Sequence, residues 1–161
     1  MNILFVCTHN RCRSILSEAL LRDIAGNDIA VASAGSAASG QVHPLSIAHL
    51  RREGIDTTGL HSKSWDDIED FAADVVITVC DSAAGEACPL WLGNALKIHW
   101  PLKDPSSIAG SEQEIDDAFT ACIEEIRQRC ALLLDLVQRG LPTTDWPAAL
   151  ASTGATTGKG N

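Results

Sequence analysis

A thiol and a guanidinium near the start of the chain have the spacing of a catalytic anion-binding loop. Cys7 is followed after five residues by Arg13 and then by Ser14, in the run CTHNRCRS. An ionised cysteine is a nucleophile, and a guanidinium can donate two parallel hydrogen bonds to two oxygens of one anion. The Ser14 hydroxyl can hydrogen-bond to the sulfur. We therefore predict that Cys7 attacks a tetrahedral oxyanion.

The elements on either side of this run are suited to position it. The apolar run ILFV at 3–6 predicts a buried strand, and residues 14–25 predict a helix. Backbone N–H groups and the positive end of the helix dipole would converge on the loop, which favours both a bound anion and the thiolate form of Cys7. The predicted anion-binding residues are Thr8, His9, Asn10, Arg11, Cys12, Arg13 and Ser14.

Strand-like and helix-like segments alternate along the rest of the chain. The predicted strands are 2–7, 29–33, 74–80 and 96–100, and the predicted helices are 14–25, 44–53, a short turn at 66–72, and a long helix from Ser111 to Gly140. The buried stripe expected on the first helix is Ile15, Leu16, Ala19, Leu20 and Ile24. This alternation predicts an α/β fold: a single-domain, doubly wound, four-stranded parallel sheet with helices on both faces.

The same pattern sets the expected domain limits. Residues 1–140 are predicted to form the one domain, and Ser111 with Glu114 predicts a capping box at the start of its last helix. Residues 141–161 are rich in Pro, Thr, Ala and Gly, so we expect a disordered C-terminal tail.

Three of the predicted strand ends carry reactive side chains. Ligands of parallel sheets bind at the carboxyl ends of the strands, where Cys7, Cys80 and Asp104 would meet. Cys80 could attack an adduct on Cys7, and Cys88 could then form a disulfide with Cys80, provided the intervening loop moves. A buried thiol with a coincidental loop cysteine is the structural alternative. Zinc is a weaker one, because the spacing lacks the paired ligands of structural sites.

The remaining candidates have supporting roles. Asp104, fixed by the following proline, could protonate a leaving oxygen or could merely cap a turn. Asn10 tolerates the left-handed conformation that a tight loop needs, and Glu18 and Ser33 could brace it.

Cys122 and Cys130 fall on the apolar face of the last helix, where packing is expected. No metal site is predicted, because His43, His49, His61 and His99 show no ligand spacing.

The composition is that of an ordinary globular protein. Apolar residues make up 45% of the 161 residues, yet no apolar stretch approaches the roughly 20 residues of a membrane span. A net charge of −9 argues against nucleic acid and anionic membranes as partners. The N-terminus shows no targeting signal, so we expect a cytoplasmic monomer whose six cysteines are thiols or a redox set.

Several segments together resemble a known family. The Cys-x5-Arg-Ser loop followed later by Asp-Pro is similar to the low-molecular-weight protein tyrosine phosphatase fold family, and within it to arsenate reductases of the thioredoxin-coupled type. The matching segments are FVCTHNRCRS at 5–14, ASAG at 32–35, Val79-Cys80, Cys88-Pro89, Ile98-His99-Trp100 and Asp104-Pro105. The resemblance covers roughly residues 2–139.

The resemblance implies a mechanism and its residues. Cys7 would attack arsenate held by the loop and Arg13, with Asp104 as the acid. Cys80 would then attack Cys7 and release arsenite, and Cys88 would attack Cys80. An external thiol system, thioredoxin or glutaredoxin with glutathione, would reduce the resulting disulfide. Phosphate and sulfate would mimic arsenate in the loop.

The chain departs from the family pattern at several positions. His9 stands where many members have glycine, and seven residues rather than six separate Cys80 from Cys88, which leaves the reductant open. Certain members bind potassium near Asn10, Glu18 and Ser33, with an Asp in the segment at 61–64. This chain has a lysine there, which already supplies positive charge, so no metal or other cofactor is expected.

Two other functions fit the same residues. A phosphotyrosine phosphatase would share the loop, but Ser106 and Ser107 replace the aromatic residues seen in phosphatases. Aromatic walls would have to come from Trp65, Trp91 or Trp100. The other alternative is a non-enzymatic anion-binding or redox-sensing domain. Loss of Cys80 would distinguish the two enzymes, because a phosphatase would keep its hydrolytic activity without this thiol and a reductase would lose arsenate reduction.

Overall fold

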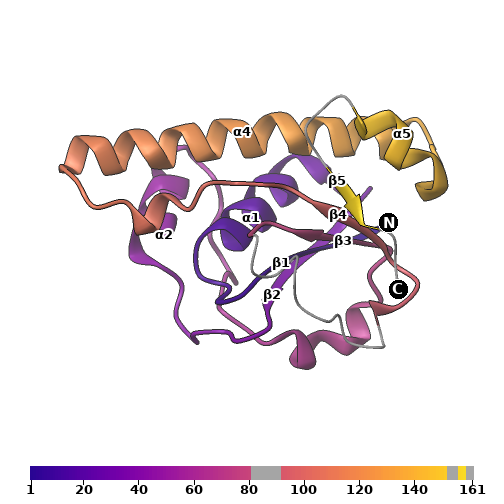
Figure 1. Cartoon of the computed structure of the whole chain (residues 1–161), viewed down its shortest axis with the longest axis horizontal. Helices are drawn as coiled ribbons and strands as arrows, with labels where there is room; N and C mark the ends of the chain where they lie inside the picture. The colour runs from indigo at the N-terminus through magenta and orange to yellow at the C-terminus, as the bar shows by residue number, and fades with distance from the viewer. Residues whose placement is uncertain (81–91, 152–155, 159–161) are drawn as a thin grey trace.

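The architecture is a twisted sheet with helices packed around it (Figure 1). The computed structural model describes residues 1–80, 92–151 and 156–158. Its strands are β1 (Asn2–Cys7), β2 (Ala30–Gly35), β3 (Val75–Thr78), β4 (Leu96–His99) and β5 (Thr156–Gly158), in the order β2-β1-β3-β4-β5. The first four strands are parallel, which confirms the predicted fold class; β5 pairs antiparallel with β4 and was not expected.

Helices cover the sheet and set the position of its loops. They are α1 (Arg13–Ala25), α2 (Pro44–Arg52), α4 (Glu112–Gln138) and α5 (Trp146–Leu150), with the 3-10 helices η1 (Trp65–Phe71), η3 (Pro105–Ser107) and η4 (Thr143–Asp145). Figure 1 shows α1 and α4 together above the sheet and η1 below it. The Ser111 hydroxyl accepts a hydrogen bond from the Glu114 N–H at 3.2 Å, so the predicted N-cap of α4 is confirmed.

The central strand β1 is buried along most of its length. Ile3, Leu4 and Phe5 are fully buried, as expected for an apolar run covered on both faces. The predicted stripe of α1 is wrong at its end, because Ile24 is 39% exposed while Leu21 is fully buried. Every residue from 14 to 21 is buried, since the sheet and α4 both pack against α1 and burial is not confined to one stripe.

The strand order brings the reactive ends together. β1 lies between β2 and β3, so the chain leaves β1 toward one neighbour and later returns to the other side, which is a topological switch point. Cys7 pairs with Gly35, and Val6 pairs with Thr78. Cys80, two residues beyond the end of β3, therefore lies close to the start of the loop that follows Cys7.

The expected disorder of 141–161 does not hold for the first part of that segment. Residues 143–150 form η4 and α5, with Trp146 fully buried and Leu150 only 4% exposed. The Trp146 indole N–H donates to the Leu141 carbonyl at 3.0 Å. Burying a large indole with its one polar group satisfied offsets the entropy of ordering these few residues.

We expect Trp146→Ala to lower the free energy of unfolding by about 3–5 kcal/mol, because it leaves a large cavity under α5. Urea unfolding followed by circular dichroism measures the change. Thr144→Ala, at an exposed position two residues earlier, is the control and should change stability by less than about 0.5 kcal/mol. Equal stability of the two variants would show that α5 does not contribute to the folded core.

Candidate active site

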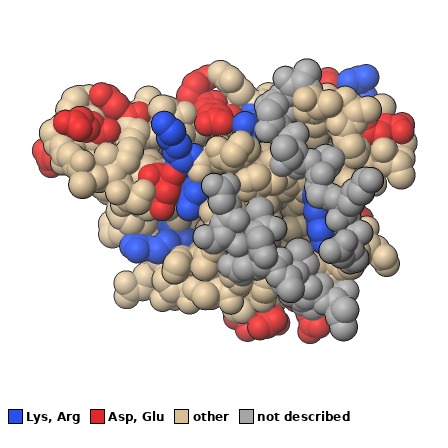
Figure 2. Space-filling view, viewed as in Figure 1, with Lys and Arg blue, Asp and Glu red and all other residues tan. Residues whose placement is uncertain are grey.

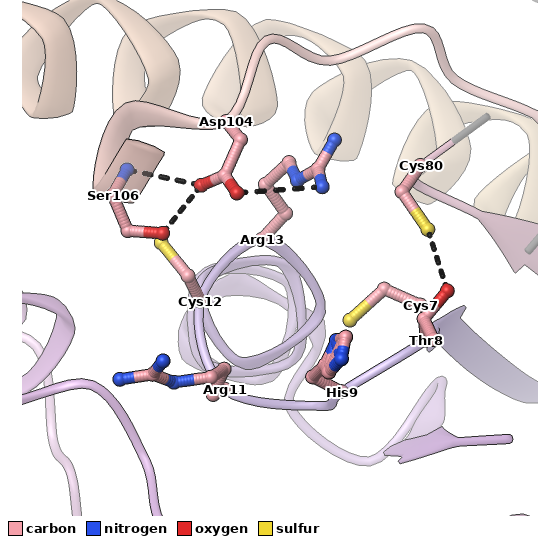
Figure 3. Close-up of a pocket in the computed structure, with 9 residues that line it drawn as sticks. All are labelled: Cys7, Thr8, His9, Arg11, Cys12, Arg13, Cys80, Asp104 and Ser106. Atoms are coloured by element: carbon pink, nitrogen blue, oxygen red, sulfur yellow. Dashed lines mark hydrogen bonds and ion pairs between the residues drawn. The ribbon is translucent and has the colours of Figure 1, made fainter. Parts of the chain in front are cut away.

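The loop between β1 and α1 lines a pocket of about 350 Å³ at the carboxyl edge of the sheet. In Figure 3, Cys7 and Cys80 lie on one side of this pocket, Cys12, Asp104 and Ser106 lie on the other, and Arg13 lies between them. The residues lining it are Cys7, Thr8, His9, Arg11, Cys12, Arg13, Cys80, Asp104 and Ser106. Predicted nucleophile, cation and acid thus share one cavity.

The sulfur of Cys7 is held by donors from its own loop. The Asn10 backbone N–H donates to Sγ at 3.2 Å, and the Ser14 hydroxyl lies 2.9 Å from Sγ. These two contacts hold the sulfur at the N-terminus of α1, where it lines the pocket. Cys7 is only 6% exposed, so it is accessible through the pocket rather than from the open surface.

Asn10 organises the loop through its backbone and its side chain. Its φ of +48° confirms the expected left-handed conformation. Its Nδ2 donates to the Ser14 hydroxyl at 2.8 Å and to the Ser33 hydroxyl at 3.0 Å. Ser33 in turn donates to Glu18 Oε2 at 2.6 Å. The structure therefore brings the three bracing candidates together, with Glu18 reaching Asn10 through Ser33.

Lys63 and Gly35 also support this loop, although neither was predicted to contact it. The Lys63 backbone N–H donates to Asn10 Oδ1 at 2.9 Å, and its ammonium lies 3.9 Å from Glu18 Oε2. Burial lowers the pKa of Lys63. A Cβ on Gly35 would lie 2.6 Å from the Thr8 carbonyl oxygen, so a larger residue there would displace the loop. The feature of the sequence that could have indicated this close contact was the glycine that ends the ASAG segment at 32–35.

Arg13 is anchored at the far side of the pocket. Its Nη1 donates to the Leu102 carbonyl at 2.9 Å, and its Nη2 lies 3.6 Å from Asp104 Oδ2. These two contacts fix the plane of the guanidinium, which can then present paired N–H donors to an oxyanion above Cys7. Asp104 also caps η3 through its side chain, so the cap and the pocket acid are the same residue.

The second reactive thiol reaches the same pocket from β3. Cys80 is 5% exposed, and its Sγ lies 3.7 Å from the Thr8 hydroxyl, at the start of the catalytic loop. Cys7 and Cys80 both line the cavity (Figure 3). The structure thus brings together the two cysteines that the proposed relay needs first. Cys88, the third predicted member, lies outside the described residues.

The other described cysteines have a different environment. Burial raises the pKa of Cys12 to about 11 and that of Cys122 to about 12, and it raises the pKa of Cys130 as well. These thiols stay protonated at neutral pH, so Cys12 is a poor nucleophile although it lines the pocket. Cys122 and Cys130 are buried on α4, which confirms the packing expected for them.

Other features of the site concern metals, membranes and charge. In residues 1–80, 92–151 and 156–158, no three His, Cys, Asp or Glu side chains are grouped to hold a metal ion. No helix in this part of the chain combines the length and hydropathy of a membrane span.

Figure 2 shows acidic side chains gathered where α4 begins. An anion must therefore be held by the loop N–H groups and Arg13 against an unfavourable overall charge.

No indole or phenyl group is among the residues that line the described part of the pocket. Trp100 is 1% exposed, with its ring 5.4 Å from that of Phe5, and Trp65 begins η1 below the sheet. Neither provides the aromatic wall that a phosphotyrosine ring would need. Trp91, the remaining candidate, lies outside the described residues.

Comparison with known proteins places this site in a family. A model of the low molecular weight phosphotyrosine protein phosphatase family matches residues 2–142. The arsenate reductase of Staphylococcus xylosus is 37% identical over 128 residues, covering 79% of this chain and 96% of that protein. The arsenate reductase of Bacillus subtilis strain 168 is 33% identical over 127 residues, covering 79% and 90%.

Solved structures show the same relationship. The structure of an arsenate reductase in the phosphate binding state has a TM-score of 0.70 and 29% identity, and the match covers 84% of this chain and 98% of that one. A thioredoxin-dependent arsenate reductase of Corynebacterium glutamicum has a TM-score of 0.67 and 30% identity, covering 86% of this chain but only 62% of that one. The chain belongs to the low-molecular-weight phosphotyrosine protein phosphatase family.

Proposed function

We propose that this protein reduces arsenate to arsenite by a relay of cysteine thiols and so serves in arsenic detoxification. The observation that carries the proposal is the meeting of Cys7 and Cys80 in one anion pocket with Arg13 and Asp104. A phosphatase needs only the first thiol, because water completes its reaction. A second thiol beside the nucleophile supplies the electrons that a reductase needs. The curated relatives named arsenate reductase support the same function.

The first step is displacement at arsenic. Arsenate is held by the N–H groups of residues 8–14 and by Arg13, and the Cys7 thiolate forms an S–As bond as one As–O bond breaks. Asp104 donates a proton to the departing hydroxyl group of arsenate, which leaves as water. The Ser14 hydroxyl lies 2.9 Å from the sulfur and helps to position it before attack. No oxidation or reduction has yet occurred.

The second step transfers two electrons. Cys80 attacks the Cys7 sulfur, the S–As electron pair stays on arsenic, and arsenite leaves as a Cys7–Cys80 disulfide forms. Cys88 then attacks Cys80, which frees Cys7 as a thiolate and leaves a Cys80–Cys88 disulfide. A reductant outside the chain must restore the two thiols. A reducing compartment suits such a cycle, and we place the enzyme in the cytoplasm as a monomer.

We infer that the reductant is thioredoxin or the glutaredoxin–glutathione pair, and a structural neighbour is thioredoxin-dependent. The test is NADPH oxidation by purified enzyme with arsenate, coupled either to thioredoxin and its reductase or to glutaredoxin, glutathione and glutathione reductase. Turnover with one system, and none when arsenate is omitted, supports the proposal and names the reductant. Absence of arsenate-dependent oxidation with both systems would contradict it.

Phosphomonoester hydrolysis through a phosphorylated Cys7 is the second candidate. The phosphate-like cradle, the nucleophile and the acid would serve it equally well, because phosphate and arsenate have the same shape and charge. The lining of the described pocket, without indole or phenyl groups, disfavours a phosphotyrosine substrate. Comparing kcat/KM for arsenate with that for an aryl phosphate ranks the two activities directly.

A further inference from the structure

One oxygen of the Asp104 carboxylate is held by Ser106, which lines the same pocket. Ser106 donates twice to Oδ1, from its backbone N–H at 2.9 Å and from its hydroxyl at 2.6 Å. The other oxygen, Oδ2, faces Arg13 Nη2 at 3.6 Å (Figure 3). The two oxygens of this carboxylate are thus in different environments.

The difference decides which oxygen can carry a proton. A carboxylate oxygen that accepts two hydrogen bonds has both of its lone pairs occupied, so protonating Oδ1 would break one of them. Oδ2 has no such obligation: its described contact is the guanidinium that also binds the substrate anion. Once an oxyanion occupies the pocket and pairs with Arg13, Oδ2 is the atom able to hold the transferable proton.

The backbone around Ser106 is set to keep this arrangement. Pro105 is buried and fixes the chain immediately after Asp104, and η3 packs against α4. The neighbouring Ser107 donates its hydroxyl to the Asp104 carbonyl at 3.0 Å, and its side chain is exposed. Ser107 thus reaches the main-chain carbonyl of Asp104 and neither oxygen of its carboxylate, so of these two adjacent serines only Ser106 acts on the acid group.

We propose that Ser106 is the positioning residue of the general acid: it fixes Oδ1 so that Oδ2 delivers the proton to the leaving oxygen. The proposal rests on the proposed function for the identity of that oxygen. In the step, the proton moves from Oδ2 to the departing arsenate hydroxyl group, which leaves as water, and Asp104 becomes a carboxylate. The Ser106 hydroxyl stabilises that carboxylate and keeps its plane aligned with the pocket.

The test is steady-state arsenate reduction by Ser106→Ala, with Ser107→Ala as the matched control. We expect Ser106→Ala to lower kcat about tenfold, the usual effect of losing a hydrogen bond to a charged group, with KM changed less than about twofold. In the profile of kcat against pH, the fall in rate at high pH should move to higher pH in Ser106→Ala. The reason is that a carboxylate with one stabilising hydrogen bond fewer loses its proton less readily. Ser106→Thr, which retains the hydroxyl, should restore kcat, and Ser107→Ala should leave both parameters unchanged.

A double-mutant cycle separates this role from contact with the substrate. On an Asp104→Asn background, Ser106→Ala should cost nothing further, because the acid through which it acts is absent. The same tenfold loss on that background, or a rise in KM in place of the fall in kcat, would overturn the proposal. Equal thermal unfolding midpoints for the two serine variants exclude a folding defect as the cause.

A measurement without turnover keeps this inference distinct from the proposed function. The Asp104 carboxyl carbon can be followed by NMR as the pH changes, in the wild type and in Ser106→Ala. The titration midpoint should move to higher pH in the variant and stay in place in Ser107→Ala. An unmoved midpoint would overturn the role of Ser106, whereas a wild type that does not reduce arsenate would overturn only the proposed function.

Discussion

Cys80→Ser is expected to reduce arsenate turnover to the uncatalysed level while leaving Cys7 chemically competent. Without the second sulfur, the Cys7–arsenic adduct has no partner to take over its bond, and arsenic keeps its oxidation state. Cys7→Ser should remove the adduct itself. Hydrolysis of an aryl phosphate separates the two variants, because it needs Cys7 and not Cys80. It should survive in Cys80→Ser and be lost in Cys7→Ser.

Cys122→Ser provides the matched control for loss of a buried thiol. Cys122 lies on α4 and is not among the residues that line the described part of the pocket, and burial raises the pKa of its thiol to about 12, so it is protonated at neutral pH. We expect this variant to reduce arsenate at the wild-type rate. Mass mapping of the disulfide trapped after one turnover would identify the paired cysteines. Wild-type turnover by Cys80→Ser with a dithiol reductant would show that the relay is wrong.

Arg13→Lys is expected to lower kcat/KM for arsenate by about 10²–10³, the effect of removing a preorganised donor to a developing oxyanion. Lysine keeps the positive charge but loses the planar fork, so it cannot hold two oxygens of one anion. It would also lose the anchoring of the guanidinium to the Leu102 carbonyl and to Asp104. Steady-state kinetics measures the loss of kcat/KM, and inhibition by phosphate measures the weaker binding of the anion.

Arg22→Lys is the control for this substitution on the same helix. Arg22 lies at the other end of α1, where its guanidinium donates to the carbonyls of Asp56 and Thr58. We expect its kcat/KM to equal that of the wild type. Unchanged kinetics and unchanged phosphate inhibition in Arg13→Lys would show that the anion is bound elsewhere.

The catalytic loop could be predicted because its parts are neighbours in the chain. A strand that ends at Cys7, a five-residue loop and a helix that begins at Arg13 follow one another without a break, so local propensity alone places Cys7, Arg13 and Ser14 around one point. The left-handed conformation of Asn10 follows from the same local constraint. Hydrophobic runs likewise marked the four parallel strands, because buried strands need them.

Contacts between distant segments were harder to predict. The contact between Asn10 and Ser33, 23 positions apart, was predicted, but the contacts of Asn10 with Lys63 across 53 positions and of Thr8 with Cys80 across 72 were not. Spacing along the chain does not encode such pairs, because they depend on strand order and on the path of each connection. The folded segment at 143–150 was missed for a related reason: its composition resembles a tail, and only the burial of Trp146 orders it.

By itself the sequence predicted the chemistry of this site, a cysteine nucleophile facing an anion-binding helix terminus, because those groups are consecutive in the chain. The tertiary structure decided which contacts are made by the groups that come from elsewhere in the chain. It brought Cys80 beside the loop, set Asp104 against Arg13, and placed Ser106 on the carboxylate. The physical reason is that parallel strands gather their carboxyl ends at one edge, whatever distance separates those ends in the chain.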